Sequence, residues 1–183
     1  RVYIEPHRIS WHWDNNPEPL MKYAKDDVYE TRLLSEYLSP SLFYLTQMIP
    51  FNYGAAARLG SSAKIESLLL REYVRQRESV PQRDVGVQTT GGYTDIFHTG
   101  VLGPILDADV ESLYPSIMLT EQISPRSESL GIFLPLLESL TNMRLATKQK
   151  MKTAGDPVTK AKYDAMQSSY KILINSFYGY LGY

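Results

Sequence analysis

The amino-acid sequence predicts a helix-rich α/β fold, and three observations support this class. Hydrophobic residue types make up 43% of the 183 residues, which is enough to form a packed core. Residues 20–38, 134–153 and 158–178 are long stretches of good helix formers. Residues 101–110 form a short apolar run that turns acidic, and its residues are compatible with a strand that ends at a site.

Composition limits the class of protein but says little about its chemistry. The 19 Lys and Arg residues nearly balance the 20 Asp and Glu residues. Binding to a nucleic acid or a membrane would therefore depend on local clusters of charge rather than on the net charge. The absence of cysteine excludes disulfides and thiolate metal sites. No uninterrupted apolar stretch approaches the ~18 residues of a membrane-spanning helix. The chain opens on Arg1 and stops in mid-pattern, which predicts a piece of a longer, soluble protein.

The first third of the chain is predicted to be helical. Pro17 and Pro19 precede residues 20–38 and favour a helix start there, because proline fits the first helical turn. Pro40 and Pro50 bracket a short apolar segment that we expect to form a separate buried helix. A further helix is expected over residues 60–78, whose apolar residues recur at helical spacing.

An acidic cluster marks the end of the predicted strand. Asp107, Asp109 and Glu111 alternate, so an extended backbone places them on one face. Three carboxylates so close together suit a hard cation such as Mg²⁺, although a solvated strand edge is the alternative. The turn that follows, residues 112–116, offers backbone N–H groups and an aromatic ring, a combination suited to a phosphate and sugar.

The last third predicts an antiparallel helical hairpin. Gly155 and Pro157 separate two helices of about 20 residues, each ~30 Å long. The first helix carries a basic stripe of Arg144, Lys148 and Lys152, which recur every four residues. The second helix offers polar groups about one turn apart, namely Lys171, Asn175 and Tyr178. A basic stripe alone is more often a solvated face. Two facing helices with cations near a carboxylate-held metal instead fit a triphosphate.

Tyr23 and Asp27 form a third pair, one helical turn apart. A tyrosine and a carboxylate at this spacing could orient a metal-bound water. Taken alone, they are more readily explained as a half-buried aromatic and a surface acid. The sequence contains no glycine-rich phosphate loop followed by lysine, no paired histidines at ligand spacing and no nucleophile elbow.

These residues resemble motifs of the family B (α-like) DNA polymerases. Residues 109–117, DVESLYPSI, resemble the family's motif A, DxxSLYPSI, and residues 171–179, KILINSFYG, resemble its motif B, KxxxNSxYG. Tyr23 to Asp27 is similar to the third exonuclease motif, YxxxD, and Gly91-Gly92 is similar to the glycine pair between the proofreading and polymerase halves. The resemblance spans nearly the whole chain.

The resemblance implies a role for each matching residue. Asp109 would be the catalytic aspartate, with Asp109 and the Val110 carbonyl as ligands of two Mg²⁺ ions. The turn at Ser112, Leu113 and Tyr114 would hold the triphosphate, with the Tyr114 ring as a steric gate against a ribose 2′-hydroxyl. The fingers residues that grip the phosphates would be Arg144, Lys148, Lys171 and Asn175, while Tyr178 would lie against the nascent base pair. In the exonuclease, Asp27 would bind metal and Tyr23 would position water.

The resemblance also implies a division of the chain. Residues 1–50 would be the C-terminal part of a 3′–5′ exonuclease domain, residues 51–130 the linker and N-terminal palm, and residues 131–183 the fingers hairpin and return to the palm. The expected fold is therefore an exonuclease-domain edge, a partial palm sheet and a two-helix fingers hairpin. Motif C and the first two exonuclease motifs are missing from these residues, so we expect the 183-residue piece alone to be inactive.

The implied function of the parent is template-directed DNA synthesis, in which a primer 3′-hydroxyl attacks a dNTP. This makes it a DNA-directed DNA polymerase, a nucleotidyltransferase of DNA replication with proofreading. Its expected partners are primer–template DNA and dNTPs, with a processivity factor as a further candidate and no membrane. In a prokaryote, the protein is expected in the cytoplasm, associated with the nucleoid. In a eukaryote, it is expected in the nucleus. The alternative is a non-catalytic polymerase-like structural or binding module.

Overall fold

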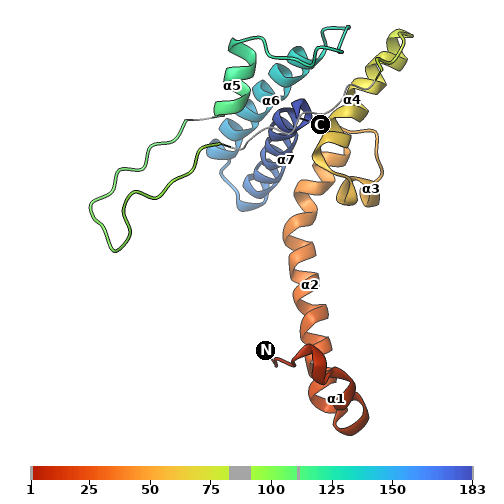
Figure 1. The fold of residues 1–183 in the computed structure, drawn as a ribbon, viewed down its shortest axis with the longest axis vertical. Helices are drawn as coiled ribbons and strands as arrows, with labels where there is room; N and C mark the ends of the chain where they lie inside the picture. The colour runs from red at the N-terminus through yellow and green to blue at the C-terminus, as the bar shows by residue number, and fades with distance from the viewer. Residues whose placement is uncertain (1, 83–91, 111, 183) are drawn as a thin grey trace.

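The computed structural model describes residues 2–82, 92–110 and 112–182, and all regular secondary structure in these residues is helical. Figure 1 shows a body of packed helices from which one long helix, α2, extends. The elements in chain order are η1 Pro6–Arg8, α1 Ile9–Asn15, α2 Pro17–Thr46, α3 Tyr53–Arg58, α4 Ser61–Gln76, α5 Leu113–Thr120, α6 Phe133–Thr153 and α7 Pro157–Leu181. The helix-rich class predicted from the sequence is confirmed. None of the helices in the described ranges is long and apolar enough to cross a membrane.

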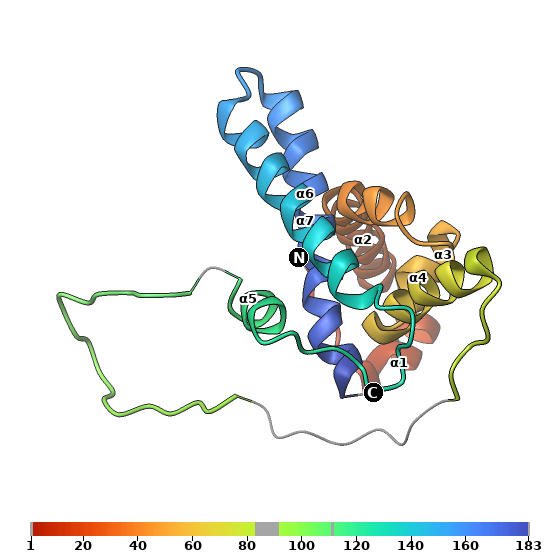
Figure 2. The ribbon, with the colours of Figure 1, turned by 90° about the horizontal axis from the view of Figure 1, so that it is seen from above.

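Helices α6 and α7 form the predicted antiparallel hairpin, and its tip projects beyond the other helices (Figure 2). Asp156 caps α7, because its side chain accepts a hydrogen bond of 2.8 Å from the Thr159 N–H. That hydrogen bond lowers the pKa of Asp156. The cap therefore stabilises α7 at neutral pH and is lost as the pH falls through the lowered pKa.

The core lies where α6 and α7 pack against α4 and the end of α2. The rings of Phe133 and Phe177 join the two hairpin helices, with centroids 5.0 Å apart. Each fully buried side chain of this size contributes roughly 1.5–3 kcal/mol of transfer free energy. Buried side chains from the four helices are Leu45, Ile65, Leu68, Leu69, Phe133, Leu137, Leu140, Leu173, Ile174 and Phe177.

The start of α6 is fixed by hydrogen bonds to the loop before it. The Tyr73 hydroxyl of α4 accepts a bond of 2.9 Å from the Ser129 N–H. The Glu128 carboxylate accepts bonds from the N–H groups of Leu130, at 2.8 Å, and Phe133, at 3.3 Å. Burial, together with nearby Glu66, Tyr73 and Glu128, raises the pKa of Tyr180 in this region. These contacts tie the base of the hairpin to α4.

The prediction of two helices separated at Pro40 is wrong, because α2 runs through this residue as one helix. Proline removes one backbone hydrogen bond and crowds the carbonyl four residues earlier, which ordinarily ends or kinks a helix. Tertiary contacts beyond Pro40 offset that cost. Leu45 is 2% exposed, and the fully buried Ser169 hydroxyl of α7 donates to the carbonyl oxygens of Ser41, at 2.6 Å, and Ala165, at 2.8 Å.

Ser169→Ala is expected to lower the free energy of unfolding by about 1 kcal/mol, because it removes a buried donor between α7 and α2. Urea unfolding of the 183-residue polypeptide, followed by circular dichroism, measures the change. Ser168→Ala is the matched control, because the Ser168 hydroxyl is half-buried and accepts a hydrogen bond of 3.1 Å from the side-chain amide of its neighbour Gln167 on the same helix. Equal unfolding midpoints for the two variants would contradict the assignment.

The predicted strand over residues 101–110, and with it the partial palm sheet, is absent from the described residues. This segment is irregular and belongs to a long excursion away from the helices (Figure 2). Val101 and Leu106 are almost completely exposed. A strand is stabilised by hydrogen bonds to a neighbouring strand, and the described ranges contain no second strand for it to pair with.

Candidate functional site

The candidate site is built around the first turn of α5. Ser112 precedes this helix in the left-handed conformation (φ 56°, ψ 43°), and its carbonyl accepts a hydrogen bond of 3.0 Å from the Ser116 N–H. A non-glycine residue in this region of backbone space is uncommon and marks a tightly constrained turn. Pro115 and Met118 are buried on the inner side of α5, which leaves Leu113 and Tyr114 nearly half exposed on the outer side.

Arg144 connects this turn to the helical hairpin. Its Nη1 atom donates a hydrogen bond of 3.1 Å to the Ser112 hydroxyl, across 32 residues of sequence. The Nε atom of Arg144 is buried and has no hydrogen-bond partner among the described residues. The guanidinium therefore retains a donor at the point where α6 approaches the turn.

Tyr114 meets the second hairpin helix. Its ring stacks on the ring of Tyr178 from α7, with centroids 4.3 Å apart and planes 27° apart. The hydroxyl end of Tyr114 lies beside Gly92, where an added Cβ would be 3.7 Å from the oxygen. Three segments distant in sequence thus meet at one tyrosine. The glycine pair that the sequence singled out includes Gly91, which lies outside the described residues.

The remaining predicted phosphate-binding residues lie on the same two helices. Lys148 is half-buried one turn along α6 from Arg144. Lys171, Asn175 and Tyr178 follow one another on α7 at intervals of four and three residues, so they share one face of the helix. The side chains of Lys171 and Asn175 are exposed. The structure therefore brings Ser112, Tyr114, Arg144 and Tyr178 into contact and places Lys171 and Asn175 on the adjoining face of α7.

The predicted metal ligands are not assembled. Asp107, Asp109 and Val110 are exposed on the irregular segment before α5, and Glu111 lies outside the described residues. Among the side chains that the structure describes, no three His, Asp or Glu residues lie close enough to hold a metal ion. The described acidic residues Asp107 and Asp109 therefore precede the site in the sequence but are not gathered into a metal site.

The predicted exonuclease residues lie apart from this site. Tyr23 and Asp27 are half-buried in the N-terminal half of α2, the part that extends from the helical body (Figure 1). The backbone carbonyl of Asp27 accepts a hydrogen bond of 2.8 Å from the Thr31 hydroxyl, one turn further along the same helix. The structure does not bring Tyr23 or Asp27 near α5.

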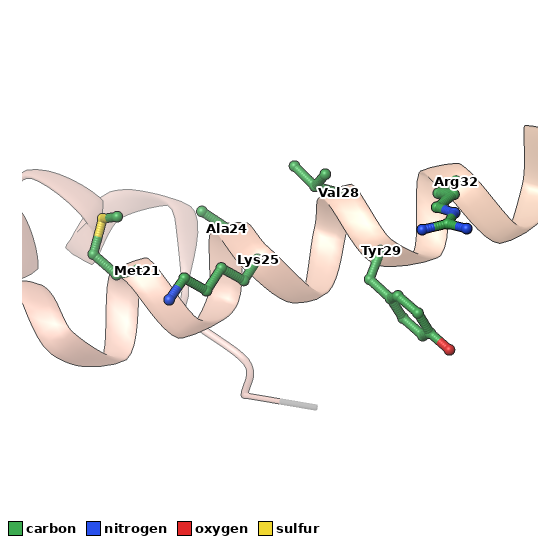
Figure 3. Close-up of a pocket in the computed structure, with 6 residues that line it drawn as sticks. All are labelled: Met21, Ala24, Lys25, Val28, Tyr29 and Arg32. Carbon is green, nitrogen blue, oxygen red and sulfur yellow. The ribbon is translucent and has the colours of Figure 1, made fainter.

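A shallow depression on α2 is a separate feature. Figure 3 shows that its six lining residues all come from one helix: Met21, Ala24, Lys25, Val28, Tyr29 and Arg32. Asp27 lies about 200° around the helix from Lys25 and Tyr29, because successive residues turn by ~100°. The depression is an open helix surface on another side from the predicted exonuclease residues.

Sequence reasoning named the site residues but missed the contacts between them. The Arg144–Ser112 hydrogen bond and the Tyr114–Tyr178 stack join residues on different helices. Periodicity relates residues within one helix and carries no signal for such pairs. The one usable signal is that the resemblance expects each partner to contact the same nucleotide.

Comparisons with known proteins agree with the resemblance to the family B DNA polymerases. The family model described as DNA polymerase family B matches residues 121–183. The DNA polymerase of Thermococcus gorgonarius is 29% identical over 211 residues, and DNA polymerase 1 of Pyrococcus abyssi is 28% identical over 212 residues. Both alignments cover 100% of this chain but only 27% and 28% of the relatives.

A solved structure extends this likeness to the fold. The family B DNA polymerase from the hyperthermophilic archaeon Pyrobaculum calidifontis matches with a TM-score of 0.71 and 26% identity. The match covers 100% of this chain and 28% of that chain, so the chain spans little more than a quarter of its relatives. Over its whole length this chain is thus similar in sequence to archaeal DNA polymerases and in fold to a family B DNA polymerase, and the family model matches its last third.

Proposed function

We propose that this chain is the central part of a template-directed DNA polymerase, called the parent polymerase below. The single observation that carries the proposal is the meeting of three elements at the α5 turn. Arg144 of α6 bonds to Ser112, and Tyr178 of α7 stacks on Tyr114. A nucleotide placed against this turn would have cations from both hairpin helices beside it.

Each group has a physical task in this proposal. The backbone N–H groups at Ser112, Leu113 and Tyr114 begin a helix, where unsatisfied donors favour phosphate oxygens. Arg144, Lys148, Lys171 and Asn175 would bind the phosphates and stabilise the charge on the leaving pyrophosphate. The primer 3′-hydroxyl attacks the α-phosphate of the dNTP, forming the new ester bond as the bond to the pyrophosphate oxygen breaks.

Magnesium fits the donor chemistry next to this turn. The Asp109 carboxylate and the Val110 carbonyl are oxygen ligands of the kind that Mg²⁺ prefers, and both residues are accessible to solvent. When bound, the metal would polarise the reacting phosphate. In the sequence, Asp109 and Val110 come three and two residues before Ser112, so they would lie beside the proposed phosphate site in the parent polymerase.

The finer assignments are part of the same proposal. Residues 101–110 would pair as a palm strand in the parent polymerase, where other strands offer partners. Residues 1–50, 51–130 and 131–183 would belong to the exonuclease domain, the linker with the palm, and the fingers. Tyr23 would position water, and Asp27 would bind metal, in the proofreading site. The parent would bind primer–template DNA and dNTPs, with a processivity factor as a further partner, in the nucleoid or the nucleus.

Arg144→Ala in the parent polymerase tests the phosphate site. The loss of charge-assisted hydrogen bonds is expected to raise the KM for dNTP by roughly 10- to 100-fold. Single-nucleotide primer extension with Mg²⁺ measures KM and kcat. Lys150→Ala is the control, because Lys150 is exposed in the last turn of α6 and lies outside the basic stripe of Arg144, Lys148 and Lys152.

The same assay separates the proposed enzyme from its alternative. Magnesium-dependent extension by the parent polymerase supports the polymerase assignment. DNA binding without incorporation would favour the non-catalytic structural or binding module. We expect the 183-residue polypeptide alone to give no extension, because it holds one of the carboxylates that a two-metal mechanism requires.

A further inference from the structure

We propose that Tyr178 is a positioning residue for sugar selection, because its ring holds the Tyr114 ring in place. The proposal deepens the function proposed above and rests on it. The two rings are stacked at 4.3 Å between centroids, one on α5 and the other on α7. Sequence motifs assign Tyr178 to the base pair, and the stack gives it a second task at the sugar.

A steric gate selects only if it cannot move aside. A ribose 2′-hydroxyl adds one oxygen to the sugar, and a tyrosine ring that turns to another staggered rotamer makes room for it. Tyr114 lies in the first turn of the eight-residue helix α5, and 45% of it is exposed. Such a side chain has open solvent on one side and requires contacts on the other to remain in place.

The contacts that restrain Tyr114 come from two directions. Tyr178 covers a face of the ring, and Gly92 lies at its hydroxyl end, where an added Cβ would be 3.7 Å away. A stacked aromatic pair contributes interaction energy beyond simple burial. Turning Tyr114 away from the sugar therefore requires breaking the stack. The energy of the stack adds to the discrimination between ribose and deoxyribose.

Helix α7 links this restraint to phosphate binding. Lys171 and Asn175 lie on the same face of α7 as Tyr178, within two turns. Tyr178 is 41% exposed, whereas the adjacent Phe177 is fully buried against Phe133 and fixes the helix from an adjoining side. The same placement of helix α7 therefore presents Lys171 and Asn175 to the phosphates and holds the Tyr178 ring against Tyr114.

Single-nucleotide incorporation by the parent polymerase tests this proposal. The measured quantity is the ratio of kcat/KM for a dNTP to that for the rNTP with the same base. Tyr178→Ala is expected to lower this ratio by about two- to tenfold, the range that an aromatic pair provides. Tyr178→Phe keeps the ring and is expected to keep the ratio within about twofold of the original.

Two further variants act as controls. Tyr163→Ala removes a half-buried tyrosine from the same helix, ~22 Å away along its axis, and is expected to leave the ratio unchanged. Tyr178→Leu removes the flat ring but keeps apolar volume, so a lowered ratio in this variant supports the proposal even if Tyr178→Ala folds poorly. A role limited to the base pair would change selection between bases and leave the sugar ratio intact.

A double-mutant cycle distinguishes failure of this inference from failure of the proposed function. If Tyr178 acts through Tyr114, adding Tyr178→Ala to Tyr114→Ala produces no further fall in the ratio. A fall for Tyr114→Ala with no change for Tyr178→Ala and Tyr178→Leu would overturn the inference and leave the proposed function standing. An unchanged ratio for Tyr114→Ala would instead overturn the gate itself.

Discussion

Replacing Asp109 with asparagine in the parent polymerase is expected to reduce kcat for primer extension by about 10³-fold. The amide keeps the size of the side chain but removes the negative charge that would hold Mg²⁺. Metal stabilisation of the reacting phosphate contributes several kcal/mol, and each 1.36 kcal/mol corresponds to a tenfold change in rate. Rapid-quench measurement of single-nucleotide incorporation at saturating dNTP measures the loss.

Asp107 provides the matched control for Asp109. Both carboxylates are exposed on the same irregular segment, two residues apart. Only Asp109 matches the aspartate of motif A, so Asp107→Asn is expected to retain most of the activity. If the two variants lost activity equally, the cluster as a whole would be the metal site, and the assignment of a single aspartate would be wrong.

Replacing Tyr114 with alanine is expected to lower the preference for dNTP over rNTP by about 10²-fold. This is the size of discrimination that a shaped pocket achieves against a substrate with one added hydroxyl. The ring is nearly half exposed on the outer side of α5, so its removal leaves Pro115 and Met118 in the core. The protein should therefore remain folded and incorporate dNTP, while rNTP incorporation rises.

Tyr114→Phe is the control for this result. It keeps the ring and its stack on Tyr178 but removes the hydroxyl that lies beside Gly92. Steric selection depends on the ring, so the phenylalanine variant should retain the sugar preference. If Tyr114→Phe lost the preference as fully as Tyr114→Ala, selection would depend on the hydroxyl group rather than on the ring.

The accuracy of the sequence predictions follows the range of the interactions involved. The hairpin was predictable because helix capping and apolar spacing are local, and α6 and α7 begin and end within a few residues of the expected positions. The structure of residues 101–110 was not predictable in the same way. A strand forms only by pairing with a partner strand, which the described residues lack. The continuity of α2 through Pro40 was missed for a similar reason. Its support comes from Ser169, distant in sequence.

The candidate site shows the same division. Motif spacing named Tyr114 and Tyr178 individually. Tyr178 lies on a helix expected from the sequence, whereas Tyr114, expected in a turn, lies in the first turn of helix α5. Their stacking depends on how α5 packs against α7, which no spacing within either motif encodes. The prediction of metal ligands identified Asp109, but the other groups needed to complete a metal site are not gathered around it in the described residues.

The continuity of α2 also has a mechanical consequence. The helix is held at Ser41 and Leu45, while Asp27 lies ~21 Å away along the same rod. A tilt of about 5° at the held end therefore displaces Asp27 by ~2 Å, by the geometry of a lever of that length. Catalytic groups must be held to within ~0.5 Å. A proofreading site on this helix thus requires a second support near its N-terminal half, in addition to the contact with α7.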